Sequence, residues 1–239
     1  PAGLIGGGGN PVPGEITRAH NGILFLDELA EFKRSTVELL RAPMESGKVI
    51  HVRKNRSVEY PCDFMLVAAM NPCPCGYYPD ISRCRCTPNQ VRSYLGRISH
   101  AFLDRIDIII EAEKIDFDDN IYNDIDVQSS ADILKMTEAA KNIQKKRYEG
   151  SSVTCNARMS SDDIKKWCSI SGPGLSFLKD IYKGWGLSVR SYNKLLKVAR
   201  TIADYEGSED ITSSHIEEAV FYRKAEYRLW NKTGELIWS

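Results

Sequence analysis

Two adjacent carboxylates follow a short apolar run near the start of the chain. The run Ile23–Leu26 leads directly into Asp27 and Glu28. Such a run is typical of a strand buried on both faces of a parallel sheet, and open α/β sheets bind ligands at the carboxyl ends of their strands. Asp27 would hold Mg²⁺ through water, and Glu28 would polarise an attacking water molecule. The alternative is a pair of acids that caps the following helix.

An asparagine follows a second apolar run. Residues 64–70 predict another buried strand, and Asn71 comes directly after it. An amide in this position can hydrogen-bond to an attacking water or to a γ-phosphate. A turn-forming Asn before Pro72 is the alternative.

Two arginines stand at element boundaries. Arg105 precedes the apolar run 106–111, which predicts a third strand, and Arg190 lies at the start of a predicted helix. Guanidinium groups suit the stabilisation of phosphoryl-transfer charge, including charge in a neighbouring subunit. A surface ion pair of Arg105 with Asp104 or Asp107 explains an isolated arginine equally well, and Arg190 is otherwise a solvated residue at a helix start.

Four cysteines are clustered within fourteen residues. They form two C-x-C pairs, Cys73 with Cys75 and Cys84 with Cys86. Four thiolates can close a tetrahedral Zn²⁺ site, although C-x-C is less usual for zinc than C-x2-C. The alternatives are a reduced, partly exposed cluster or a disulfide formed after purification. The other three cysteines are expected to be packing residues.

A basic hairpin is predicted from two short β-type runs, 49–52 and 58–60, which flank a polar turn. Its basic side chains are Lys48, Arg53, Lys54 and Arg56. They would either contact DNA phosphates or protect a solvated sheet edge. No aromatic platform accompanies them, so sequence-specific recognition of DNA is not indicated.

These motifs together resemble magnesium-chelatase-like AAA+ ATPases, and within them the ComM (YifB) branch, bacterial proteins implicated in DNA branch migration. The resemblance rests on GEI at 14–16, AHNG at 19–22, LFLDEL at 24–29, AAMNPCPCG at 68–76, CRC at 84–86, LDRID at 103–107 and LLKVAR at 195–200. It covers nearly the whole chain.

The resemblance implies a role for each candidate residue. Asp27 and Glu28 would be the Walker B pair, Asn71 sensor 1, Arg105 an arginine finger and Arg190 sensor 2. Asp27, Asn71 and Arg190 would contact ATP or its Mg²⁺. It also implies a homo-oligomeric ring, expected to be a hexamer, that acts on DNA. A motor that remodels a protein partner is the alternative, as is a non-catalytic zinc-bearing module.

One motif of the family is missing from these 239 residues. No G-x-x-x-x-G-K-[ST] occurs, and the glycine run 6–9 is followed by Asn10 and Pro11 instead of Lys and Ser or Thr. In this family the P-loop precedes Walker B, so the chain is expected to start after it. We expect the full-length protein to hydrolyse ATP and this chain alone to be inactive.

The elements that must position these residues predict two modules. Strands alternate with helices over 1–112, which indicates an α/β layer, the C-terminal part of an AAA+ core. Residues 113–127 carry six acids and one lysine and are expected to be a linker. Residues 128–239 predict an all-α lid domain, with helices that begin near Ser129, Ser160, Ser188 and either Ser213 or Ser214. The chain has no apolar stretch long enough for a membrane span and no signal peptide, so a cytoplasmic location with reduced thiols is expected.

Overall fold

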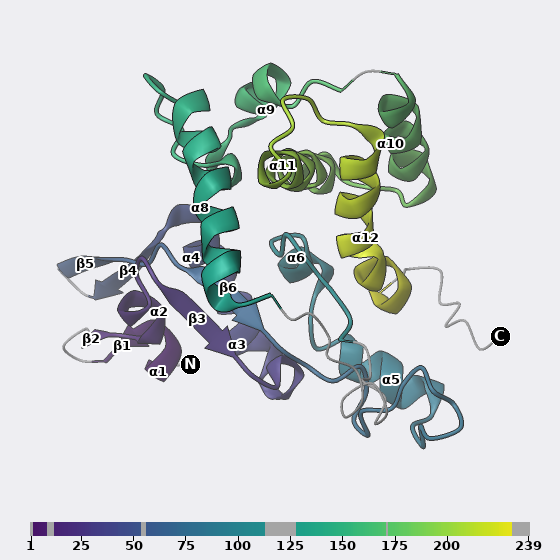
Figure 1. The fold of residues 1–239 in the computed structure, drawn as a ribbon. Helices are drawn as coiled ribbons and strands as arrows, with labels where there is room; N and C mark the ends of the chain where they lie inside the picture. Colours follow the sequence, from purple (N-terminus) through teal and green to yellow (C-terminus); the bar gives the residue numbers. More distant parts are fainter. Residues whose placement is uncertain (1, 9–11, 54–55, 113–127, 171, 231–239) are drawn as a thin grey trace. The chain divides into compact units, whose positions relative to one another are not determined.

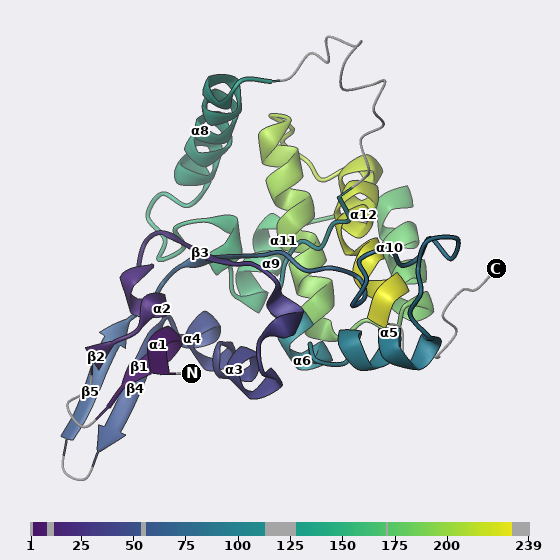
Figure 2. The same cartoon turned by 90° about the horizontal axis from the view of Figure 1, so that it is seen from below.

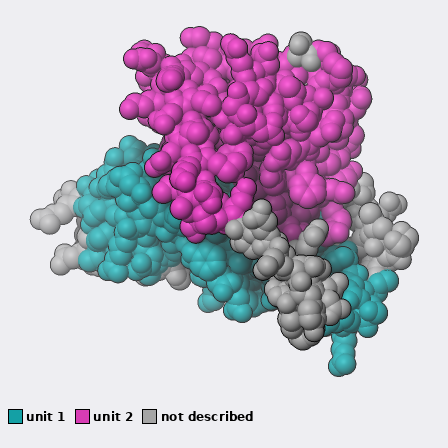
Figure 3. Space-filling model, viewed as in Figure 1, with its two compact units in different colours: residues 1–106, 229–239 teal, residues 107–228 magenta. Residues whose placement is uncertain are grey.

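The computed structural model describes residues 2–8, 12–53, 56–112, 128–170 and 172–230 (Figure 1). The chain divides into two compact units, which Figure 3 shows in different colours. Unit 1 comprises Pro1–Ile106 with Leu229–Ser239, and unit 2 comprises Asp107–Arg228. The acidic segment 113–127 lies outside the described residues. Within the described part, no helix is both long and apolar enough to span a bilayer.

Unit 1 contains the parallel strand pair that the two apolar runs predict. β3 (Ile23–Leu26) pairs with β6 (Met65–Ala68) in parallel, with Leu26 opposite Ala68. The expectation that both faces of these strands are buried is wrong. Leu24 and Leu26 are buried, but Ile23 and Phe25 are each about 60% exposed because side chains alternate between the two faces of a strand and only one face is covered.

Three short helices follow β3. They are η1 (Leu29–Glu31), α3 (Arg34–Leu39) and α4 (Arg41–Ser46). Pro43 has no backbone N–H to donate to the carbonyl of Leu39, which interrupts the hydrogen-bond ladder at the junction of α3 and α4. Gly47 ends α4 in the left-handed region, as its position predicts.

The basic hairpin is confirmed as a two-stranded antiparallel sheet. β4 (Lys48–Arg53) pairs with β5 (Arg56–Pro61), and both project beside the N-terminal elements (Figure 2). Those elements are α1 (Ala2–Ile5), β1 (Gly6–Gly7), β2 (Val12–Pro13) and α2 (Glu15–Arg18). His51 Nε2 lies 3.2 Å from the Ile5 carbonyl oxygen, which links the hairpin to this N-terminal segment.

The third predicted strand, 106–111, does not form. Ile108 and Ile110 are about half or more exposed, and the backbone N–H of Ile109 donates to the Tyr222 carbonyl at 2.7 Å. A strand requires a neighbouring strand to satisfy its backbone groups, and none of the described strands lies beside this segment.

Two helices of unit 1 follow the cysteine cluster. α5 (Pro88–Leu95) begins with a capping box, in which Thr87 Oγ1 accepts from Gln90 N and Gln90 Oε1 accepts from Thr87 N. α6 (His100–Leu103) is capped by Ser99. The string TPNQ at 87–90 is the sequence signature of the capping box of α5.

Unit 2 is helical, as the sequence predicts. Its elements are α8 (Ser130–Arg147), η2 (Asn156–Arg158), α9 (Ser161–Trp167), α10 (Pro173–Gly184), α11 (Val189–Tyr205) and α12 (Ser213–Trp230), whose last two residues belong to unit 1. Ser129, Ser160 and Ser188 cap their helices through side-chain oxygens, which confirms three predicted starts. α12 begins at Ser213 itself, one or two residues before the start expected from a cap at Ser213 or Ser214.

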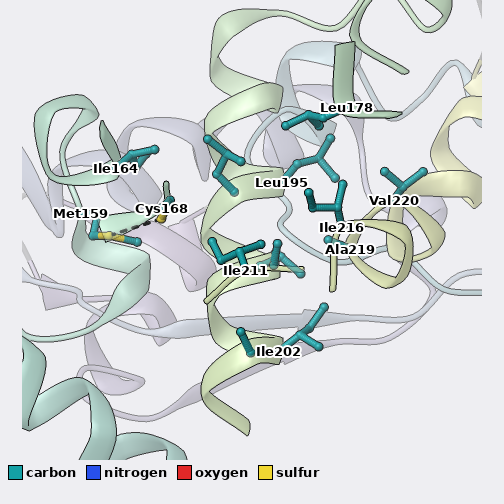
Figure 4. Packing of buried hydrophobic residues seen from close by; sticks show 14 of the residues in the cluster. Met159, Ile164, Cys168, Leu178, Leu195, Ile202, Ile211, Ile216, Ala219 and Val220 are labelled. Carbon is teal, nitrogen blue, oxygen red and sulfur yellow. Dashed lines mark hydrogen bonds between the residues drawn. The ribbon is translucent and has the colours of Figure 1, made fainter. Parts of the chain in front are cut away.

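The core of unit 2 is built around α11. Leu195 of this helix lies near Leu178 of α10 and Ile216 of α12, and Ile202 belongs to the same cluster further along the helix, while Met159 and Cys168 pack at the other side (Figure 4). The apolar side chains of α11 therefore face the core.

A polar group is buried in the same helix. Asp204 has a fully buried carboxylate that accepts from Arg147 Nη1 at 2.7 Å, Arg200 Nε at 3.1 Å and Asn156 Nδ2 at 2.9 Å. The two guanidinium groups compensate for the loss of carboxylate hydration. The contact with Asp204 also raises the pKa of Arg147.

Candidate functional site

The two parallel strands bring Asp27, Glu28 and Asn71 to the same edge of their sheet. The last paired residues are Leu26 and Ala68, so the chain leaves both strands at the same level. Leu29 N then donates to the Ala69 carbonyl at 2.9 Å, which holds the two exit segments together. More than forty residues separate Asp27 from Asn71 in the sequence. The parallel pairing of β3 with β6 brings the ends of the two strands that precede them together.

The backbone between the two carboxylates is tightly turned. Glu28 has φ 50° and ψ 45°, a left-handed conformation that non-glycine residues rarely adopt. Its backbone N–H donates to Asp27 Oδ1 at 2.8 Å. Such strained conformations persist only where the surrounding structure compensates for the strain. They are concentrated at functional sites.

All three side chains are exposed at the strand ends, Asp27 and Glu28 from β3 and Asn71 after β6. Carboxylate and amide oxygens are hard ligands, so this donor set fits Mg²⁺. The arrangement can accept a hydrated magnesium ion and can hydrogen-bond to a water molecule or phosphate.

Arg105 lies after α6 in unit 1 and is held by a partner that the sequence did not indicate. Its Nη2 lies 2.7 Å from Glu45 Oε1, and Nη1 donates to the Ala101 carbonyl. Only 12% of the Arg105 side chain is exposed, because Glu45 and the Ala101 carbonyl hold its guanidinium group against unit 1. Asp107 forms an ion pair with Lys194. No local sequence signal connects Glu45 with Arg105.

Arg190 is exposed in the first turn of α11, in unit 2. Ser188 caps this helix by accepting from Ser191 N at 3.0 Å. Arg190 raises the positive potential around Lys194, whose pKa is lowered to about 8 mainly because it is buried.

Of the candidate residues of the basic hairpin, Lys48 is the first residue of β4, Arg53 is the last residue of β4, and Arg56 is the first residue of β5. Arg53 and Arg56 stand opposite each other in the last register pair, and Lys54 lies outside the described residues. Lys48 forms an exposed ion pair with Glu59 at 3.1 Å. The apolar side chains of Ile50 and Val52 are also more than half exposed, so the hairpin presents both charged and apolar surface.

The four clustered cysteines converge on one point. All four Sγ atoms lie within 4.8 Å of one another, and Cys73 is fully buried while the other three are partly exposed. The Sγ–Sγ distances are 3.4 Å between Cys73 and Cys75, 3.8 Å between Cys73 and Cys84, and 3.6 Å between Cys75 and Cys84. All four are free thiols.

The thiols differ in acidity because their surroundings differ. Backbone N–H groups of Tyr77 and Arg85 lower the pKa of Cys75 to about 6. Burial raises the pKa of Cys84 to about 12 and also raises that of Cys86. Cys75 therefore ionises more readily than Cys84 and Cys86.

Comparisons with known proteins give the chain a family. Residues 1–120 match the family described as magnesium chelatase, subunit ChlI, and residues 127–223 match the C-terminal family of the same subunit. The chain is 43% identical over 220 residues, 92% of its length, to the YifB protein of Escherichia coli. It is 41% identical over 234 residues, 98% of its length, to the competence protein ComM of Haemophilus influenzae.

The match to magnesium-chelatase subunits themselves is shorter. The 67 kDa subunit of Chlorobaculum parvum is 37% identical over 59 residues, which is 25% of this chain. The chain spans less than half the length of YifB and ComM, 42% and 45%. The two family matches and the two long alignments agree, and the chain belongs to the magnesium-chelatase-like family, in the group of ComM and YifB.

Proposed function

We propose that the full-length protein is a Mg²⁺-dependent AAA+ ATPase that forms a ring, a hexamer in our proposal, and moves along or remodels DNA in the cytoplasm. The observation that supports this proposal is that the parallel strands β3 and β6 end at the same level, with Asp27 and Glu28 directly after β3 and Asn71 three residues after β6. Unit 1 would then be part of the AAA+ core and unit 2 its lid.

Each residue at the strand ends has a task in this proposal. Asp27 would hold the hydrated Mg²⁺ that accompanies ATP, and that ion would neutralise phosphate charge. Glu28 would accept a hydrogen bond from the attacking water and orient it. Asn71 would hydrogen-bond to the same water or to the γ-phosphate.

The phosphates need a cradle that these 239 residues do not contain, because they hold no P-loop sequence. In the proposal, another part of the longer protein supplies it. Arg105 would act on the site of the neighbouring subunit, which requires it to leave Glu45 when the ring assembles, and Arg190 would contact nucleotide from the lid.

DNA is the proposed substrate for two reasons. The last register pair of the hairpin β4–β5 is Arg53 with Arg56, and Lys54 lies between them in the sequence; three basic residues within four positions suit phosphate contacts. The relative in Haemophilus influenzae is named a competence protein. The short match to a magnesium-chelatase subunit favours the second candidate, a motor that remodels a protein partner.

ATP hydrolysis by the full-length protein tests the first half of the proposal. Glu28→Gln is expected to abolish Mg²⁺-dependent turnover while ATP still binds. Glu15→Gln is the matched control, since Glu15 is exposed and pairs only with the nearby Arg18 in α2. Equal turnover by Glu28→Gln and the wild type would contradict the proposed role.

Salt-dependent binding of branched DNA tests the second half. Replacing Arg53, Lys54 and Arg56 by Gln removes three positive charges and is expected to reduce the slope of log K against log salt by about 3. The control replaces the exposed Lys141, Lys145 and Lys146 of α8 by Gln, which changes net charge equally. A similar loss in both variants would indicate general attraction without a hairpin contact, and no DNA binding at all would favour a protein partner.

A further inference from the structure

We propose that Cys73, Cys75, Cys84 and Cys86 form a tetrahedral zinc site that fixes the loop after β6 and thereby positions Asn71. The metal site is independent of the function proposed above. The positioning of Asn71 rests on that function.

The distances between the sulfur atoms match a ZnS₄ centre. With Zn–S bonds of about 2.3 Å, the sulfurs of a regular tetrahedron are about 3.8 Å apart. The three pairs that join Cys73, Cys75 and Cys84 are separated by 3.4 to 3.8 Å, and all four sulfurs lie within 4.8 Å of one another. A disulfide would bring two sulfurs to about 2.05 Å and leave the other pair apart. A set of four sulfurs that are mutual neighbours is the arrangement that a single metal ion requires.

The loop around the sulfurs is built to direct them inward. Gly76 adopts φ +81° and its N–H donates to the Cys73 carbonyl at 3.0 Å, so the chain turns sharply after the first C-x-C pair. A second turn brings Cys84 N to the Asp80 carbonyl at 2.8 Å, just before the second pair. The backbone N–H of Tyr78 points at Cys73 Sγ at 3.4 Å. A donor aimed at sulfur favours the thiolate form that a metal needs.

Little else in this segment would hold it in place. No helix or strand is present between the end of β6 at Ala68 and the start of α5 at Pro88. Loops of this length without secondary structure are uncommon in compact domains unless a functional or structural constraint holds them. The buried side chains near the sulfurs are few, chiefly Tyr78, Val91 and Leu95. A structural metal supplies the order that such a small core cannot.

Zinc is the metal that this donor set favours. Four soft thiolates in a tetrahedral arrangement select zinc or an iron–sulfur centre over magnesium or calcium. The two C-x-C pairs lack the C-x2-C-x2-C run of bacterial iron–sulfur ferredoxins. We therefore assign zinc, and the optical spectrum of the purified protein distinguishes it from iron.

The same loop lies against Asn71. Cys73 follows Asn71 by two residues, and a Cβ at Gly76 would stand 3.8 Å from Asn71 Oδ1. The turn that the metal closes is therefore packed beside the amide that the proposed mechanism uses. Loss of the metal would release this turn, so the cysteines would act as positioning residues for Asn71.

The first experiment measures metal in the 239-residue chain purified without chelator. We expect about one zinc per chain, no visible absorption, and a tetrahedral d–d spectrum after replacement by Co²⁺. Cys84→Ser is expected to lose the metal, while Cys155→Ser, in unit 2, keeps it. Because Cys84→Ser could impair folding, chelation of the wild-type chain followed by zinc addition is monitored by circular dichroism. A folded chain without metal, in which all four clustered thiols react freely, would overturn the site, and so would bound iron.

A tryptophan provides a local readout of the same site. Trp230 Nε1 donates to the Leu95 carbonyl at 3.0 Å, and its ring packs against the cluster that contains Cys73. Removal of zinc is expected to shift Trp230 fluorescence, and Trp230→Phe identifies the part of the signal that belongs to this residue. An unchanged Trp230 signal after zinc has left would contradict the loss of local order.

The positioning role is tested in the full-length protein. Zinc removal is expected to lower kcat by about 10²-fold, as misplacement of a reacting group by about 1 Å can do, while KM for ATP changes little. Addition of zinc restores the rate. The zinc-loaded Cys155→Ser protein, which keeps the metal, is expected to have the same kcat as the wild type. If the zinc-free protein stays folded with wild-type kcat, the positioning role is wrong although the site stands. If the zinc-loaded wild type has no ATPase activity, the proposed function fails while the metal measurement is unaffected.

Discussion

The Arg105 guanidinium lies 2.7 Å from the Glu45 carboxylate, although sixty residues separate them in the chain. The pair joins the end of α4 to the segment after α6 and leaves Arg105 12% exposed. An arginine that acts across a subunit boundary must exchange this partner for a phosphate. Variants of Arg105 and Glu45 therefore distinguish a catalytic role of Arg105 from a structural role.

Arg105→Ala in the full-length protein is expected to lower kcat by about 10³–10⁵-fold, the range of trans arginines in other phosphoryl-transfer enzymes. ATP binding should change little, because the group acts on transition-state charge. Glu45→Gln is the companion variant and should affect kcat far less. Equal losses of thermal stability in the two variants, with kcat preserved in both, would show that the pair is only structural.

Mixed rings test whether Arg105 acts in trans. Arg105→Ala and Glu28→Gln subunits should each be inactive alone, yet some mixed rings contain an intact Glu28 beside an intact Arg105 of the neighbour. Partial recovery of ATP hydrolysis is expected after mixing. No recovery, when subunit exchange is demonstrated by labelling, would contradict the trans assignment.

The 239-residue chain by itself is expected to show no Mg²⁺-dependent ATP hydrolysis above background, because it lacks the amides and lysine of a P-loop. A phosphate-release assay with purified chain measures this directly. Robust turnover that disappears in Glu28→Gln would show that these residues hold phosphate in another way.

Removal of the buried carboxylate in α11 should destabilise unit 2. Asp204→Asn leaves Arg147 and Arg200 without their buried counter-charge, and breaking such a network costs about 3–5 kcal/mol. Urea denaturation measures the change. Asp162→Asn is the control, since its pair with Lys165 is exposed and is worth at most about 1 kcal/mol. A cost near that of the control would mean that the two arginines find other partners.

Lys194 should make stability depend on pH. Burial lowers its pKa from 10.5 to about 8, with Asp107 acting against this and Arg223 and Arg190 adding to it. Between these pH values the unfolded chain holds a proton that the folded chain has released, so the free energy of unfolding rises with pH.

The difference in unfolding free energy between wild type and Lys194→Met isolates this effect. It is expected to move in favour of the wild type by about 1–2 kcal/mol from pH 7 to pH 9.5. Comparison with Lys183→Met, which removes an exposed lysine, corrects for net charge. Cys168, whose pKa is raised to about 11 by burial, makes the free energy of unfolding fall with pH. This opposite trend is present in the wild type and in both variants, so it cancels in the difference between them. A difference that does not change with pH would contradict the lowered pKa of Lys194.

The sequence by itself determined the features that depend on neighbouring residues. The strands β3 and β6, the β4–β5 hairpin and the helix starts after Ser129, Ser160 and Ser188 were predicted because apolar period, turn residues and capping oxygens act over a few positions. The family was also evident at this level, since its motifs are short strings.

Only the tertiary structure decided which distant groups meet. The parallel register brought the end of the strand before Asn71 level with the end of the strand before Asp27 and Glu28, and the loop geometry gathered four cysteines from two C-x-C pairs. It also gave Arg105 the partner Glu45, and it left 106–111 without a strand to pair with. Backbone pairing and ion pairs between remote residues depend on how the chain is folded back on itself, and no local pattern contains that information.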